Sequence, residues 1–138
     1  MATEERMLYT TKADSTLTGP EEVLVSSGPG RDLTVTAPPA LGGAEDRQEW
    51  NPEQLYAAAL ASCMHQALLL TAQVRGVDCG GSRVTAEVSL EHDGSLHYSF
   101  DAALSVELPQ IEPAVRAEVI AEAVRACPLA EGVRITGG

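Results

Sequence analysis

Residues 51–75 read NPEQLYAAALASCMHQALLLTAQVR. It opens with the signals that start a helix. Asn51 is a capping residue, Pro52 suits the first helical position, and Gln54 completes a spacing like that of a capping box. The glycine that follows the stretch is the residue type that most often ends a helix. The sequence therefore predicts a long helix that begins at Pro52 and runs to about Arg75.

Apolar residues in this helix recur at alternating steps of four and three, which places them on one face. The members of this face are Tyr56, Leu60, Cys63, Ala67, Leu70 and Val74. Much of the opposite face is also apolar, through Ala58, Ala61, Leu68 and Leu69. A helix that is apolar nearly all round is usually buried on several sides. We therefore expect this helix to be buried on more than one face.

Downstream of the helix, apolar and polar residues alternate at the period of a β-strand. The alternating segments are 84–91 and 96–106, and Asp93-Gly94 between them is a two-residue hairpin signal. The sequence therefore predicts an antiparallel hairpin after the long helix.

A second helix is predicted from about Pro113 to Cys127, where Pro128 prevents its continuation. A short strand over residues 133–135 closes the chain. In this order, one cysteine-bearing helix precedes the predicted hairpin and the other follows it.

The first forty residues contain three short β-prone runs separated by Gly and Pro. These runs are Met7–Thr11, Val23–Ser26 and Leu33–Thr36. The order strands, helix, hairpin, helix, strand lacks regular βαβ alternation, so the predicted class is α+β. We expect residues 1–138 to form a single domain.

The chain of 138 residues carries 20 Asp and Glu against 9 Lys and Arg, a net charge of −11. This balance repels phosphate backbones and anionic lipids, so we expect neither nucleic-acid nor membrane binding. Residues 1–6 include two acids where a secretory signal needs basic residues. The apolar stretch 55–72 contains Ser62, His65 and Gln66 and is short for a membrane span. We therefore expect a cytoplasmic protein whose three cysteines are thiols rather than a disulfide framework.

Two of these cysteines lie on predicted helices, Cys63 in mid-helix and Cys127 at a helix end. A cysteine on an apolar helix face is usually inert packing. The alternative is a thiolate that attacks a peroxide, becomes a sulfenic acid and condenses with a second thiol. That chemistry needs the two residues to converge in space, which sequence alone leaves open.

Several motifs, in order, resemble those of the OsmC/Ohr family of osmotically inducible and organic hydroperoxide resistance proteins. They are Leu41-Gly42-Gly43, Asn51-Pro52-Glu53-Gln54-Leu55, Ser62-Cys63 and Cys127-Pro128. The resemblance covers nearly the whole chain. It implies an OsmC/Ohr-like fold and an intertwined homodimer with active sites at the subunit interface.

The resemblance also implies a thiol peroxidase that reduces organic hydroperoxides. Cys63 would be the peroxidatic residue and Cys127 the resolving one, with regeneration by an external dithiol such as a lipoyl group and no bound cofactor. Glu53 matches the family glutamate that orients an arginine beside the reactive cysteine. Since about 15 Å of helix separates Glu53 from Cys63, Glu53 of a partner subunit would have to act, through a cation.

That cation is absent from its usual place, because residues 17–22 read LTGPEE without an arginine. An arginine there would lower the pKa of a thiol and would bind the peroxide. Arg47, in the loop before the long helix, is a candidate substitute, and Arg31 is a weaker one. The alternative for Arg47 is a solvated loop charge.

The remaining cysteine, histidine and aromatic residues are expected to have simpler roles. Cys79 matches no family motif and is expected to be an exposed spectator thiol. His65 is turned about 200° from Cys63 on the helix, so it is a poor base for that thiol. Trp50 and Tyr56 would line an apolar entry or simply pack. Since no His or Cys pair has the close spacing of a zinc site, we expect no metal.

Two functions of different class therefore remain. The first is an organic hydroperoxide reductase, and the second is an OsmC-like small-molecule binding or redox-sensing protein with little or no turnover. A structural dimer with inert cysteines ranks third.

Overall fold

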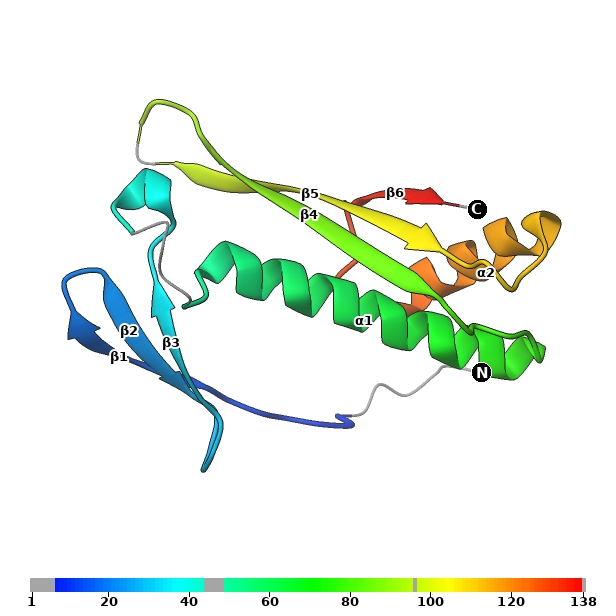
Figure 1. Cartoon of the computed structure of the whole chain (residues 1–138), viewed down its shortest axis with the longest axis horizontal. Helices are drawn as coiled ribbons and strands as arrows, with labels where there is room; N and C mark the ends of the chain where they lie inside the picture. Colours follow the sequence, from blue (N-terminus) through cyan, green and yellow to red (C-terminus); the bar gives the residue numbers. More distant parts are fainter. Residues whose placement is uncertain (1–6, 44–48, 96, 138) are drawn as a thin grey trace. The chain divides into compact units, whose positions relative to one another are not determined.

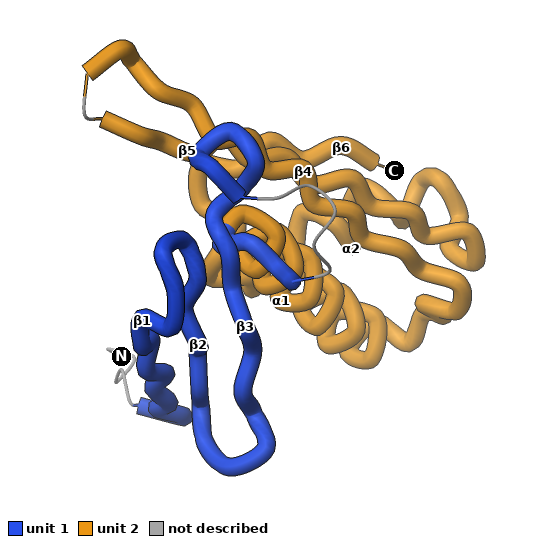
Figure 2. The backbone as a smooth tube through the Cα atoms, turned by 60° about the vertical axis from the view of Figure 1, so that its left-hand side comes forward, with its two compact units in different colours: residues 1–52 blue, residues 53–138 orange. Residues whose placement is uncertain are grey.

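The computed structural model describes residues 7–43, 49–95 and 97–137. The chain divides into two compact units, unit 1 over residues 1–52 and unit 2 over residues 53–138 (Figure 2). Unit 1 holds a three-stranded sheet, and unit 2 holds a second three-stranded sheet with the two long helices. The α+β class predicted from the order of elements is therefore confirmed.

Unit 1 is an antiparallel sheet of consecutive strands. Its elements are β1 (Asp14–Gly19), β2 (Glu22–Ser26) and β3 (Asp32–Thr36), followed by a short 3-10 helix, η1 (Pro39–Leu41) (Figure 1). The predicted strand at residues 7–11 is wrong. Met7, Leu8 and Tyr9 are exposed and lie outside any strand, because pairing with β2 begins only at Asp14.

Unit 2 contains the long helix, the hairpin and the second helix. Its elements are α1 (Pro52–Arg75), β4 (Arg83–His92), β5 (Tyr98–Glu107), α2 (Pro113–Ala126) and β6 (Arg134–Gly137). The sheet order is β4-β5-β6, in which β5 pairs antiparallel with β4 and parallel with β6. α1 runs along one face of this sheet (Figure 1). The parallel pair arises because α2 carries the chain back before β6 begins.

The hairpin is confirmed, but its predicted two-residue turn is wrong. The last paired residues are His92 and Tyr98, so the connection spans residues 93–97. The Asp93 carboxylate accepts hydrogen bonds from the backbone N–H and the hydroxyl of Ser95. This Asp93–Ser95 side-chain turn is present in place of the tighter two-residue turn that Asp-Gly favours.

Both helices and β5 contribute to the core of unit 2. Its largest fully buried side chains are Leu60, Met64, Leu68, Leu104 and Val119. The cluster continues to the end of α2, where Cys127 and Ala130 are buried. The apolar residues of β4 are half-buried and alternate with exposed polar ones, as the sequence predicts.

α1 ends as predicted, because Gly76 adopts φ 69° and the Val77 N–H closes on the Ala72 carbonyl. Its buried side differs from the predicted face. The buried residues are Leu60, Met64, Ala67, Leu68, Thr71 and Ala72, whereas Leu70 and Val74 are exposed. A helix that is apolar nearly all round does not reveal which arc will pack inward. As a result, Cys63 lies at the margin of the buried arc and not at its centre.

By length and composition alone, α1 is long and apolar enough to cross a membrane. The core helix of a soluble protein meets the same criterion, so this is weak evidence for a membrane span. α1 supplies three of the largest fully buried side chains of unit 2, so its apolar residues pack in the core of that unit.

Candidate active site

Cys63 and Cys127 meet in unit 2. Cys63 lies in the middle of α1, and Cys127 is the residue that follows the last turn of α2. Pro128 disfavours helical geometry at the residue before it, and Cys127 accordingly adopts an extended backbone at φ −97° and ψ 109°. The two sulfurs lie 3.4 Å apart, although 64 residues separate them in the chain.

The two thiols differ in environment. Cys127 is buried at 4% exposure, whereas Cys63 is half-buried. Burial raises the pKa of the Cys127 thiol, and its hydrogen bond to Cys63 raises it further. Backbone hydrogen bonds from Leu129 and Ala130 oppose this shift, because amide N–H groups favour a negative sulfur. The net effect is that the pKa of the Cys127 thiol lies above its ordinary value.

An aromatic pair lies on the same side of α1 as Cys63. Tyr56 precedes Cys63 by seven residues, which is close to two helical turns. Its ring stacks on Phe100 of β5 with centroids 5.2 Å apart, and Phe100 is 49% exposed. The sequence placed Tyr56 beside the motif, but the contact with Phe100 crosses from helix to sheet and had no sequence signal.

Glu53 lies in the first turn of α1. Its Oε1 atom is buried and finds no hydrogen-bond partner in the part of the chain that the structure describes. A buried carboxylate oxygen ordinarily has a donor. Ten residues of helix, about 15 Å, separate Glu53 from Cys63. Within one chain, therefore, Glu53 does not reach the cysteine pair.

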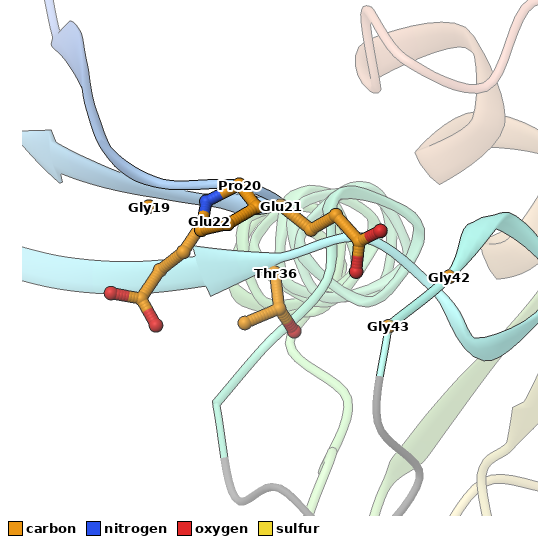
Figure 3. A pocket seen from close by; sticks show the side chains of 7 residues that line it. All are labelled: Gly19, Pro20, Glu21, Glu22, Thr36, Gly42 and Gly43. Carbon is orange, nitrogen blue, oxygen red and sulfur yellow. The ribbon is translucent and has the colours of Figure 1, made fainter.

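Unit 1 contains a separate, open cavity of about 470 Å³ (Figure 3). Its lining residues are Gly19, Pro20, Glu21, Glu22, Thr36, Gly42 and Gly43. The Glu21 carboxylate points toward Gly42, where a Cβ would lie only 2.5 Å from its Oε1. The turn between β1 and β2 thus presents a carboxylate over the Leu-Gly-Gly segment. This pairing was missed at the sequence level.

The proposed substitute cation, Arg47, lies outside the described residues. Arg31 lies in the turn before β3, where its backbone N–H donates to the Gly28 carbonyl. It belongs to unit 1, and the cysteine pair belongs to unit 2.

Two arginines of unit 2 are committed to carboxylates elsewhere. Arg75 donates to Glu118 at 2.9 Å and to Glu122 at 2.5 Å, which ties the end of α1 to α2. Arg134 forms a two-pronged pair with Asp101. These contacts hold elements together and do not involve either sulfur.

The histidines also have local partners. His65 Nε2 is hydrogen-bonded to Ser82 Oγ at 2.8 Å. His92 stacks on Tyr98 and bonds the Ser95 carbonyl. Within residues 7–43, 49–95 and 97–137, no group of three or more His, Cys, Asp or Glu could hold a metal ion.

Cys79 corrects a prediction, because it is half-buried rather than exposed. Its thiol lies 3.9 Å from the Leu68 carbonyl and packs against the core. Burial raises the pKa of Cys79, and the neighbouring Asp78 carboxylate adds to the shift.

The chain is similar to known proteins in sequence and in fold. Residues 43–135 match the family described as OsmC-like protein. The chain belongs to this family. It is 31% identical over 139 residues to an organic hydroperoxide resistance protein of Xanthomonas axonopodis pv. citri, covering 97% of this chain and 93% of that protein.

Solved structures of OsmC-like proteins agree with this assignment. An organic hydroperoxide resistance protein from Legionella pneumophila matches with a TM-score of 0.81 at 27% identity, over 95% of this chain and 96% of that one. The organic hydroperoxide resistance protein from Elizabethkingia anophelis matches with a TM-score of 0.82 at 27% identity, over 95% of each chain. The OsmC/Ohr resemblance inferred from the motifs is therefore confirmed.

Proposed function

We propose that this OsmC-like protein is a thiol peroxidase that reduces organic hydroperoxides through a Cys63–Cys127 disulfide. The observation that carries the proposal is the 3.4 Å separation of the two sulfurs. Relatives named organic hydroperoxide resistance proteins support a role in organic hydroperoxide resistance.

In the first step, the Cys63 thiolate attacks the terminal oxygen of the hydroperoxide. An S–O bond forms as the O–O bond breaks, and the alkoxide takes up a proton and leaves as an alcohol. Cys63 is thereby oxidised to a sulfenic acid and the peroxide is reduced. Cys63 suits this role because it is the more exposed of the paired thiols.

In the second step, Cys127 attacks the sulfenic sulfur. The S–S bond forms as the S–O bond breaks, and the departing hydroxide leaves as water with the Cys127 proton. An external dithiol of the lipoyl type then reduces the disulfide by exchange and becomes a disulfide itself. No cofactor needs to stay bound for this cycle.

The surroundings of Cys63 favour apolar peroxides. Cys63 packs against the apolar core of unit 2, and the half-buried Tyr56, stacked on the exposed Phe100, lies along the same side of α1. These groups offer contact area to an organic chain, whereas hydrogen peroxide gains nothing from them.

A homodimer completes the proposal. Leu69, Leu70 and Val74 of α1 are 51%, 62% and 87% exposed in the single chain. A second copy covering this apolar surface would bury it. It would also let Glu53 of one subunit serve the cysteines of the other, with Arg47 as the cation between them. The proposed setting is the cytoplasm, without nucleic-acid or membrane partners.

A second function is favoured by the sequence of the β1–β2 region. Residues 17–22 read LTGPEE, so this region offers carboxylates and no arginine, and the cation that would lower the pKa of a reactive thiol is missing from it. On this alternative the protein binds small molecules or senses oxidation, with little or no turnover.

Titration of the reduced protein with an alkyl hydroperoxide tests both functions. We expect loss of two thiols per chain, a disulfide between Cys63 and Cys127 by mass spectrometry, and turnover once a lipoyl dithiol is added. Cys63→Ser should abolish the reaction, whereas Cys79→Ser is the matched control and should react normally. A stoichiometric disulfide without turnover would select the sensing function, and an unreactive Cys63 would end both.

A further inference from the structure

We propose that the Cys127 thiol donates a hydrogen bond to the Cys63 thiolate and so activates it before peroxide arrives. This inference deepens the proposed function and rests on it, since it takes Cys63 as the attacking thiol. It gives Cys127 a task that precedes disulfide formation.

The contact between the sulfurs has the right length. At 3.4 Å, Cys127 Sγ lies within hydrogen-bonding distance of Cys63 Sγ. Only one of two touching thiols can ionise readily, because a second negative charge would be repelled. Burial raises the pKa of the Cys127 thiol, so Cys127 is the member of the pair that keeps its proton and can donate it.

The turn after α2 strengthens Cys127 as a donor. The backbone N–H groups of Leu129 and Ala130 act to lower the pKa of the Cys127 thiol, against the larger effect of burial. A sulfur that accepts hydrogen bonds is polarised, and it donates its own proton more strongly. Since these are backbone groups that follow Pro128, the arrangement depends on the shape of the turn and needs no charged side chain.

The surrounding groups leave this role to Cys127. From α1, the nearest titratable neighbour along the chain is His65, which is hydrogen-bonded to Ser82. From α2, Arg125 lies in the last turn and Glu122 is held by Arg75. Within the described residues, no hydrogen bond or ion pair joins either sulfur to a charged side chain.

The same proton is used twice. While Cys63 is a thiolate, the proton remains on Cys127 and points at Cys63. Once Cys63 becomes a sulfenic acid, that proton leaves with the hydroxide as water when the S–S bond forms. The donor that stabilises the attacking sulfur is therefore also the acid that assists the departure of the oxygen.

The test measures alkylation of Cys63 by iodoacetamide across pH 5–9, with peptide mass spectrometry to identify the modified thiol. All variants carry Cys79→Ser so that only the pair reacts. Cys127→Ser retains a hydroxyl donor, and Cys127→Ala removes it. We expect the alanine variant to react about threefold to tenfold more slowly at pH 7 than the serine variant, with its pH midpoint raised by roughly half a unit to one unit.

Coinciding profiles for the serine and alanine variants would overturn the inference. Should the alanine variant fail to fold, Cys127→Thr and Cys127→Val form a second pair that differs in a hydroxyl at similar volume, and the same comparison decides. Because iodoacetamide replaces the peroxide, the result is independent of turnover. A protein without peroxidase activity can still show the shift, and an active one can lack it.

Discussion

Oxidation of the Cys63–Cys127 pair should stabilise unit 2 by an amount set by the chain between the two residues. A disulfide there would close a loop of 64 residues. The loop-entropy relation assigns about 4 kcal/mol to a loop of this size, since it removes conformations from the unfolded chain. The sulfurs need to approach by only about 1.4 Å to reach bonding distance, so little native distortion opposes this gain.

Urea unfolding of reduced and peroxide-oxidised protein measures this difference. Far-UV circular dichroism is the suitable signal, because α1 and α2 dominate it, whereas the fluorescence of Trp50 reports on unit 1. With an m-value of about 2 kcal/mol/M, the midpoint of the oxidised form should lie about 2 M higher. The Cys127→Ser protein, treated identically, is the control and should show no shift. An oxidised form that is no more stable than the reduced form would refute the reasoning, because bond formation would then strain the fold.

Three further predictions concern the framework of the site. Hydrogen bonding to Arg75 lowers the pKa of Glu122, so this pair stabilises the fold above the ordinary carboxyl pKa and the effect is lost as pH falls through the lowered value. The stability gap between the parent and Arg75→Gln, measured in urea, should therefore close in acid, and a gap that persists there would contradict the assignment. Gly43→Ala places a Cβ 1.7 Å from a backbone carbonyl oxygen and should cost more than about 1 kcal/mol, whereas Gly19→Ala, with its nearest contact at 3.6 Å, should unfold like the parent. Leu60→Ala empties a fully buried position and should lower the free energy of unfolding by about 2–5 kcal/mol; a loss below about 1 kcal/mol would show that the site is poorly packed.

Local signals predicted the elements of unit 2 well. Pro52 and Gly76 bound α1, and Pro128 stops α2, because each acts on the backbone within a few residues. The strand at residues 7–11 was wrong for the opposite reason. β-propensity describes a residue's fit to a sheet, and whether a neighbouring strand is available depends on the rest of the chain.

The site itself required tertiary information. The sequence identified Cys63 and Cys127 as candidates, but their 3.4 Å approach depends on how α2 packs against α1. The buried arc of α1 was equally hidden, since Leu70 is as apolar as Leu68 and only the packing distinguishes them. The effect of the Leu129 and Ala130 backbone N–H groups on the pKa of the Cys127 thiol follows from the path of the turn and has no side-chain signature.

The placement of Cys79 bears on the fidelity of disulfide exchange. A third thiol in the same molecule could attack the Cys63–Cys127 bond and scramble it, at a rate that follows its thiolate fraction and its access. Cys79 is half-buried against the core, and its pKa is raised by that burial and by Asp78. Its thiolate is therefore scarce at neutral pH, which leaves the external dithiol as the faster partner for the oxidised pair. Asp78→Asn would remove one cause of the raised Cys79 pKa and so raise the rate at which Cys79 attacks the disulfide, without changing either paired cysteine.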